Sequence, residues 1–364
     1  MKSQRVRSAG PLDARIAVVG EAPGRWEVQR GKPLVGPSGH IFNTWLTHAG
    51  LSRRDIWTGN IFEYQAPKSH INLADHAEVE AWAETIHARL PTDPWVIIPM
   101  GNVALRALQN KPLWAQASPK IGDWRGSILR YEYPEGGWAK MIPTYHPAAT
   151  FKDPSLMALC LADWRRIADE ATRRPRLLPI RRSLLPPHRP EDIARYLRMA
   201  AKPSTIMAFD IETNPPARHI LCVGFSYRWD EALIVQWPAG TAFAKAMLAS
   251  PCQKAGQFAY AYDRFWLAHE GVHVTNYVWD LIGMHHSLEA HLPHDLATQS
   301  SLYTRQPYWK TSHKESDSPT ANREPIDRLM LYNGLDCMVT RELVEVYLER
   351  YAERETPCRI AQSA

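Results

Sequence analysis

The chain has 364 residues, enough for two domains, and its hydrophobic content of 45% can supply a core to each. No apolar run approaches the roughly 18 residues that span a membrane, and the basic start MKSQRVRSAG lacks the apolar stretch of a secretory signal. Five scattered cysteines without CxxC spacing argue against a disulfide framework and for a reducing cytoplasm, and the net charge of +5 is compatible with a polyanionic partner.

The first half of the chain alternates apolar runs with amphipathic stretches. Buried strands are predicted for RIAVVGEA at 15–22, IWTGNIF at 56–62 and WVIIPMG at 95–101. Helices are predicted for HAEVEAWAETIHARL at 76–90 and GNVALRALQ at 101–109. Alternation of this kind predicts an α/β domain.

Five short motifs follow one another in this half. The glycine-rich loop VVGEAPGRWEVQRGKPLVGPSG comes after the first strand, and glycines at a helix start can expose N–H groups to a phosphate or a carbonyl oxygen. The other four are IWTGNIF, IPMGNVAL, GDWRGSIL and MIPTYHPAAT. In this order the motifs resemble the uracil-DNA glycosylase superfamily, closest to its family 4, from about Arg15 to Asp169. The resemblance implies an α/β/α sandwich with a mostly parallel sheet.

The same resemblance implies roles for individual residues. Asn60 would pair with the Watson–Crick edge of a flipped uracil, because a side-chain amide offers both a donor and an acceptor. His146 would stabilise the charge that develops on uracil O2, and the loop at Pro147 would enter the duplex. Taken singly, Asn60 could cap a turn and His146 could be a packed core residue. The first motif, which would line the uracil pocket, consists of Gly20, Glu21, Ala22, Pro23, Gly24 and Glu27. Of its two glutamates, either could activate water, and we favour Glu21.

Two features depart from family 4. That family carries four cysteines that bind an iron–sulfur cluster, whereas this half contains only Cys160, so we expect no cluster. Leu34, in GKPLVG, stands where the family usually has a stacking Phe. Since Leu lacks an aromatic face, the pocket would be weaker, altered in specificity or retained for binding only.

A basic, proline-rich segment separates the halves. RRPRLLPIRRSLLPPHRPED, residues 173–192, holds six arginines and five prolines, and proline interrupts both helices and strand ladders. We therefore expect a linker between a domain at 1–172 and a domain at 193–364. A solvated linker is the ordinary role of such a segment, although its charge could also follow a phosphate backbone.

The second half begins with three predicted strands, TIMAFDIE, ILCVGFSYR and EALIVQWP, and also contains the helical patterns AFAKAMLAS and REPIDRLMLYNGLDCMVTRELVEVYLERYAERE. In the first strand, Asp210 and Glu212 share one face while Ile211 points to the core. Two carboxylates at this spacing repel unless a cation lies between them, and divalent cations with oxygen ligands are the usual solution. A strand end that emerges into solvent is the alternative.

Three further polar residues extend this pattern. Asp263 follows the aromatic run AGQFAYAY, and Tyr332 and Asp336 share a helical face because they are four residues apart. The order Asp-x-Glu, Asp, Tyr-x-x-x-Asp resembles the tyrosine subgroup of the Asp-Glu-Asp-Asp 3′→5′ exonuclease superfamily. The intervening segment 278–310 is similar to proofreading domains of phage family-A DNA polymerases.

This second resemblance implies a ribonuclease H-like exonuclease domain with a mixed sheet. Two Mg²⁺ or Mn²⁺ ions would clamp the scissile phosphate. Asp210, Glu212 and Asp336 would hold them, Asp263 would support the outer ion, and Tyr332 would orient the attacking water. An Asn that often precedes the third carboxylate in such domains is absent from the run at 257–260, which leaves the positioning of the substrate strand open.

Four histidines of the same segment could be taken for a zinc site. Their spacing is irregular and no cysteine lies near them in the sequence. We therefore expect packing and surface roles for His285, His286, His291 and His294.

Together the two resemblances predict a bifunctional enzyme of DNA repair and proofreading that excises uracil and removes nucleotides from 3′ ends. The expected partners are uracil-containing DNA, either single strands or 3′ ends, and a separate DNA polymerase; no membrane partner is expected. Only 28 residues follow Asp336, so the protein would be free-standing or the front of a longer polymerase. In one alternative the first half binds DNA without chemistry; in another the protein is a proofreading subunit of a polymerase. A phage origin would place it in the host cytoplasm.

Overall fold

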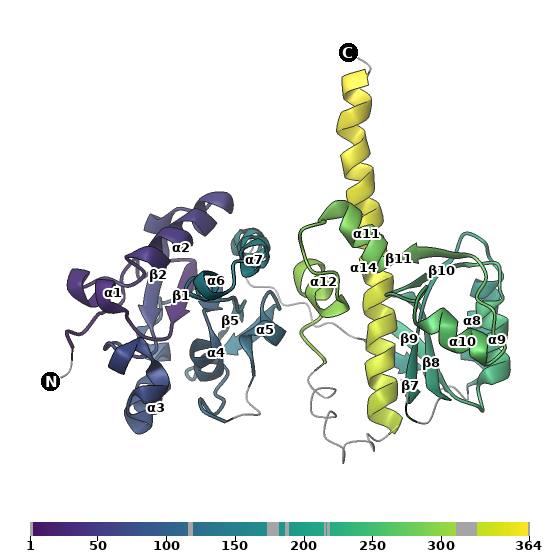
Figure 1. Cartoon of the computed structure of the whole chain (residues 1–364), viewed down its shortest axis with the longest axis horizontal. Helices are drawn as coiled ribbons and strands as arrows, with labels where there is room; N and C mark the ends of the chain where they lie inside the picture. Colours follow the sequence, from purple (N-terminus) through teal and green to yellow (C-terminus); the bar gives the residue numbers. More distant parts are fainter. Residues whose placement is uncertain are drawn as a thin grey trace. The chain divides into compact units, whose positions relative to one another are not determined.

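The structure is a computed structural model that describes residues 3–115, 119–172, 182–185, 189–214, 216, 219–310 and 326–362. The chain divides into two compact units, Met1–Leu178 and Pro179–Ala364, and each is described by itself (Figure 1). No helix among the described residues combines the length and the apolar character that crossing a bilayer requires.

The first unit contains a five-stranded sheet with helices on both faces (Figure 1). Its strands are β1 (Ile16–Gly20), β2 (Ile56–Asn60), β3 (Val96–Pro99), β4 (Leu129–Glu132) and β5 (Trp138–Met141). Its α-helices are α1 (Arg25–Arg30), α2 (Pro37–His48), α3 (His76–Glu84), α4 (Asn102–Leu108), α5 (Ile121–Trp124), α6 (Ala149–Lys152) and α7 (Leu156–Ala171). Short 3-10 helices cover Arg53–Asp55, Pro67–Ser69, Ile71–Leu73 and His87–Arg89.

The sheet has the order β2-β1-β3-β5-β4, and all neighbours are parallel except β4 with β5. Side chains of a strand alternate between its two faces. In β1, Ala17 and Val19 accordingly pack into one apolar core with α3 and α4, whereas Ile16 and Val18 pack into another with α2 and α7. The unit is therefore the α/β/α sandwich with a mostly parallel sheet that the sequence predicts.

The second unit contains a six-stranded sheet, also with helices on both faces. Its strands are β6 (Ser183–Leu185), β7 (Ile206–Asn214), β8 (His219–Arg228), β9 (Glu231–Gln236), β10 (Gln253–Gly256) and β11 (Tyr277–Asp280). Its helices are α8 (Pro190–Ala200), α9 (Thr241–Leu248), α10 (Asp263–His269), α11 (Leu281–Leu288), α12 (Leu296–Tyr303) and the long α14 (Ile326–Gln362).

The sheet of the second unit is mixed, as predicted. Its order is β11-β10-β7-β8-β9-β6; β7, β8 and β9 run antiparallel, and β6, β10 and β11 run parallel to their neighbours. Met207, Phe209 and Ile211 of β7 pack on one face against α8, α9 and α10. On the other face α14 contacts β7, β8 and β9, and α11 and α12 pack beside it. A residue of β7 that points away from Phe209 therefore faces α14.

The helix predicted at 76–90 is shorter than the pattern suggests. α3 ends at Glu84, Thr85 caps it, and the chain continues in the 3-10 helix His87–Arg89. The reason is tertiary: the Arg89 guanidinium donates to the carbonyl oxygens of Asn60, Ile61 and Trp82 at 2.8–2.9 Å. These bonds turn the chain toward the end of β2.

Part of the segment expected as a linker belongs to the fold of the second unit. Ser183–Leu185 forms β6 at the edge of the sheet, in parallel with β9. Prolines are compatible with an edge strand, and Pro190 starts α8, where its missing N–H has no helical partner to lose. Residues 173–181 and 186–188 lie outside the described residues.

Candidate functional site

The carboxyl ends of the parallel strands in the first unit meet at one edge of the sheet. β1 pairs with β2 so that Gly20 lies opposite Asn60, and with β3 so that Val19 lies opposite Pro99. Ligands of open parallel sheets bind at this edge. The motif that starts at Glu21 follows β1, Asn60 ends β2, and His146 follows β5, so these three parts of the predicted pocket lie at this edge.

Asn60 presents its side-chain amide in a protected place. The residue is only 5% exposed, and its Nδ2 is buried without a hydrogen-bond partner among the described residues. Gly20 leaves room for the amide, because a Cβ there would lie 2.3 Å from Asn60 Oδ1. Since a buried donor without a partner costs stability, this group is suited to a ligand that supplies an acceptor.

The two glutamates of the first motif have different surroundings. The Glu27 carboxylate accepts the main-chain N–H groups of Gly24 (2.5 Å) and Leu34 and so closes the loop on itself. The Glu21 side chain makes no hydrogen bond within the described part of the chain. Burial raises the pKa of Glu21, and the charge of Lys152 opposes that shift. Glu27 thus braces the loop, and Glu21 is available to a ligand or a water.

His146 is held in one tautomer. The Ala148 main-chain N–H donates to His146 Nδ1 (3.1 Å), so the proton of the neutral ring lies on Nε2. Burial lowers the pKa of His146 to about 4, and the ring is therefore uncharged at neutral pH. The loop after it is tied by Thr150 Oγ1, which donates to the Pro147 carbonyl oxygen (2.8 Å).

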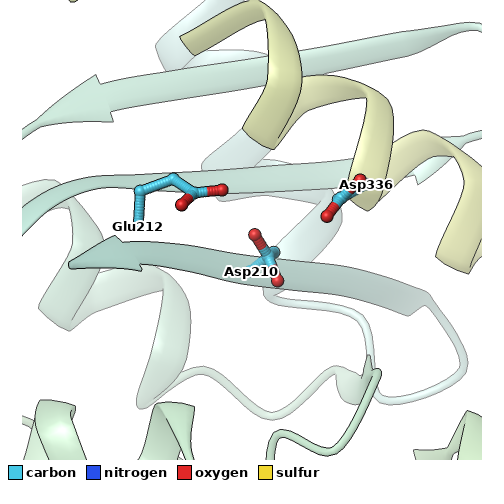
Figure 2. Close-up of side chains that lie close together, drawn as sticks. All are labelled: Asp210, Glu212 and Asp336. Atoms are coloured by element: carbon cyan, nitrogen blue, oxygen red, sulfur yellow. The ribbon is translucent and has the colours of Figure 1, made fainter. Parts of the chain in front are cut away.

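Three carboxylates of the second unit lie together. Asp210 and Glu212 come from β7 and Asp336 comes from α14 (Figure 2). One oxygen of each lies within 4.8 Å of the other two, and within the described part of the chain no other group of three such ligands is this close. Ile211, between the two acids of β7, is 5% exposed and packs in the opposite core, as predicted.

Asp263, at the start of α10, lies outside this group of three but is linked to it. Its Oδ1 accepts the Ile211 main-chain N–H (3.0 Å). Burial raises the pKa of Asp263 to about 7. Burial also raises the pKa of Asp210, and the charges of Asp263, Asp336 and Glu212 raise it further. A divalent cation would relieve this repulsion, because its charge suits crowded carboxylate oxygens.

Tyr332 and Asp336 lie one helical turn apart on α14, and Lys310 contacts both. Lys310 Nζ donates to Asp336 Oδ2 (3.2 Å) and lies 5.1 Å from the centre of the Tyr332 ring. Burial raises the pKa of Tyr332, and the charge of Asp336 adds to this effect. The phenol therefore keeps its proton at neutral pH.

Three residues that the sequence analysis did not single out hold the carboxylates in place. Asn333 Nδ2 donates to Asp210 Oδ2 (2.7 Å), and Trp309 Nε1 donates to Asp336 Oδ1 (2.7 Å). Lys310 is the third. In the sequence, two of these residues could have been found from the adjacent pair Trp309-Lys310, at the end of the segment that resembles proofreading domains. A Trp and a Lys side by side offer two hydrogen-bond donors to a carboxylate.

Three of the histidines in the segment 278–310 form hydrogen bonds among themselves and with Tyr303 and, in the described part of the chain, none with the three carboxylates. His285 is buried and shares hydrogen bonds with His294 (2.7 Å) and the Tyr303 hydroxyl (3.2 Å). His286 also contacts His294 (3.0 Å), and His291 is exposed. These are packing and surface positions.

Comparison with known proteins defines the family of the first unit. The model of the uracil DNA glycosylase superfamily matches residues 7–165. A type-4 uracil-DNA glycosylase of Archaeoglobus fulgidus is 30% identical over 169 residues, which are 46% of this chain and 82% of that protein. The chain belongs to the uracil DNA glycosylase superfamily.

Two other similarities are partial. A DNA polymerase of Bacillus phage SP01 is 24% identical over 165 residues, which are 45% of this chain and 16% of that protein. The catalytic core of RRP6 from Trypanosoma brucei has a TM-score of 0.37 and 16% identity, with 66% of each chain covered.

Within the uracil DNA glycosylase domain, Leu34 occupies an unusual position. Its backbone is left-handed (φ +51°), which is uncommon for a residue with a side chain. Its side chain is 7% exposed and packs with Phe42 in the core on the side of α2 and α7. Leu34 therefore fills the core beneath the loop, and the Glu27 carboxylate fixes its main chain.

Proposed function

We propose that the protein is a bifunctional DNA enzyme. Its first unit would release uracil from DNA, and its second unit would remove nucleotides from 3′ ends by metal-dependent hydrolysis. The convergence of Asp210, Glu212 and Asp336 within 4.8 Å carries the second activity. Family membership, together with the unpartnered amide donor of Asn60, supports the first.

Three residues at the sheet edge can divide the work of uracil release. Asn60 can pair with the flipped base through its free donor. The His146 Nε2–H can donate to uracil O2 while the bond from N1 to C1′ breaks and its electron pair stays on the base. Glu21 can accept a proton from a water whose oxygen bonds to C1′, and its raised pKa makes it a better base. The products are free uracil and an abasic site.

The carboxylate site fits hydrolysis of a phosphodiester. When bound by Asp210, Glu212, Asp336 and Asp263, two Mg²⁺ or Mn²⁺ ions would supply the charge that activates water and stabilises the phosphate. Tyr332 would orient the water through its protonated hydroxyl. The water oxygen bonds to phosphorus while the bond from phosphorus to the 3′ oxygen of the preceding nucleotide breaks. A nucleoside 5′-monophosphate and a new 3′-hydroxyl result.

An exposed aromatic segment beside Asp263 is suited to the bases of the substrate strand. Between 40% and 69% of each of four aromatic residues is exposed there, and stacking on an aromatic face stabilises an unpaired base by about 1–3 kcal/mol. We infer that these residues contact the unpaired 3′ end: Phe258, Tyr260, Tyr262 and Phe265.

One assay tests both activities. Oligonucleotides with a 5′ label and one uracil, single- and double-stranded, are incubated with EDTA or with Mg²⁺ and then treated with alkali to cleave abasic sites. We expect cleavage at uracil in both conditions, because glycosidic cleavage uses no metal here, and trimming of 3′ ends only with Mg²⁺. Asp210→Ala combined with Glu212→Ala should abolish trimming and leave uracil release unchanged.

Two results would contradict the proposal. If the double variant still trims 3′ ends, Asp210 and Glu212 are not the metal ligands that trimming requires. If no strand is cleaved at uracil in any condition, the first unit does not release uracil.

One observation favours a second function for the first unit. Leu34 replaces the family's stacking Phe and packs into the core, so the pocket lacks the aromatic face of that Phe. In this second function the first unit would bind uracil-containing DNA without cleaving it. Retention of a uracil-containing strand over its thymine-containing counterpart, without cleavage, would support this function. A partnership with a separate DNA polymerase is a further proposal, which pull-down of the intact chain with a polymerase tests.

A further inference from the structure

Lys310 places a positive charge inside the carboxylate site. Its Nζ lies 3.2 Å from Asp336 Oδ2, and the Asp336 side chain is only 8% exposed. The charge of Asp210 also acts on Lys310. The site therefore has a cation of its own, on a side chain that is one-quarter exposed.

This contact conflicts with a divalent cation. The Asp336 oxygens are occupied by Trp309 Nε1–H on one side (2.7 Å) and by Lys310 on the other (3.2 Å). The same carboxylate belongs to the group whose oxygens lie within 4.8 Å of one another. An ammonium group and a divalent ion repel each other at such distances, so Lys310 and the ion compete for Asp336.

The structure also offers Lys310 another partner. The Tyr332 ring lies 5.1 Å from Lys310 Nζ, within the range of a cation–π interaction, and the Tyr332 hydroxyl is a hydrogen-bond partner of Lys310. An ammonium group has three donors on a flexible stem. It can thus swing from Asp336 toward the side of Tyr332, where the water and the phosphate would meet.

We propose that Lys310 serves two roles in turn: it neutralises the carboxylates before the metal binds, and it then donates to a non-bridging oxygen of the scissile phosphate. The inference rests on the proposed nuclease function and adds a catalytic residue to it. In its first role Lys310 competes with the metal for Asp336. In its second it stabilises the negative charge that develops on the phosphate.

The two roles predict opposite effects of one substitution. Lys310→Met removes the competitor, so the affinity for Mn²⁺ should rise by about 5-fold, the value of a moderately buried ion pair. The same variant lacks the donor to the phosphate, so 3′ trimming at saturating Mn²⁺ should fall by about 100-fold. Lys310→Arg keeps the charge and should restore weaker Mn²⁺ binding and most of the trimming. A purely structural ion pair would not produce this opposition.

The experiment measures Mn²⁺ binding to the intact chain by isothermal titration calorimetry and trimming of a single-stranded oligonucleotide. Lys202→Met, a change of the same charge at an exposed position, controls for net charge, and Lys310→Gln serves if the Met variant does not fold. Unchanged Mn²⁺ affinity in Lys310→Met would overturn the competition, and unchanged trimming at saturating Mn²⁺ would overturn the contact with phosphate. If the unsubstituted chain itself neither binds Mn²⁺ nor trims, the proposed nuclease is wrong, which is a different result.

Discussion

Two of the proposed pocket residues of the first unit, His146 and Asn60, are uncharged at neutral pH. The His146 ring is neutral because burial lowers its pKa to about 4, and Asn60 is uncharged by nature. Burial raises the pKa of Glu21, which makes its carboxylate a stronger base. A pocket of neutral donors can receive an uncharged base without paired ions, and it can still stabilise an anionic leaving group through hydrogen bonds.

The first prediction at this scale concerns His146. In the proposed function its Nε2–H would donate to uracil O2, so His146→Ala should slow uracil release by about 100-fold. Single-turnover release of uracil from a labelled duplex measures the effect. His48→Ala, an exposed histidine at the end of α2, is the matched control and should release uracil at the normal rate. Equal rates for both variants would show that His146 is only a packing residue.

Much of each element could be predicted from the sequence, because local patterns decide it. The alternation of Asp210, Ile211 and Glu212 placed two acids on one face of β7 and the apolar residue on the other, as the structure has it. The end of α3 could not be predicted, because Arg89 fixes it through the Trp82 carbonyl oxygen of α3 and the distant carbonyl oxygens of Asn60 and Ile61.

The candidate sites follow the same rule. The strand spacing of Asp210 and Glu212 placed these two acids on one face, and the resemblance to the exonuclease superfamily added Asp336 to them. Lys310 lies far from Asp336 in the sequence, and the packing of α12 and the residues after it against α14 brings them together. Tertiary contacts of this kind produce no periodic pattern of residues from which they could be predicted.

A prediction at the scale of one element concerns the turn before α10. Phe258 has a left-handed backbone (φ +59°), which is costly for a bulky residue and is typical of functional segments. Tyr260→Ala combined with Phe265→Ala should weaken binding of a single-stranded oligothymidylate by about 10- to 100-fold, since each ring can stack on one base. Fluorescence anisotropy on the Asp210→Ala background, without trimming, measures this.

The control for this prediction is another exposed aromatic residue of the same unit. Trp229 lies in the turn after β8 and is 42% exposed, and Trp229→Ala should bind the oligonucleotide normally. An oligonucleotide of abasic sites separates stacking from contacts to phosphate. If the double variant loses affinity for both oligonucleotides to the same extent, the aromatic segment does not bind bases.

For the whole molecule, the two sites place different demands on solution conditions. Uracil release would use side chains and water without a metal, whereas trimming would use crowded acids and a metal. The two activities should therefore separate cleanly with EDTA, although one chain carries both. The carboxylates also make the stability of the second unit depend on pH in a direction unusual for acids.

That direction follows from Asp263. Burial raises its pKa from the ordinary 3.8 to about 7, so between these values the folded chain keeps a proton that the unfolded chain has lost. The stability that this proton contributes is complete below about pH 4 and is lost as the pH rises through about 7. In EDTA, the melting temperature of the second unit should fall by about 5 °C or more between about pH 5 and about pH 8.

Scanning calorimetry of the intact chain measures this, and the transition of the second unit is the one that Mn²⁺ shifts. Mn²⁺ should restore the melting temperature at the higher pH, because it binds the folded carboxylates in place of the proton. Asp263→Asn removes one of the titrating acids and should make the dependence on pH less steep, although Asp210, whose pKa burial also raises, remains. Glu349→Gln, at an exposed position of α14, should leave the dependence unchanged. A dependence as steep in Asp263→Asn as in the unsubstituted chain would mean that Asp263 is already ionised when the chain is folded without metal.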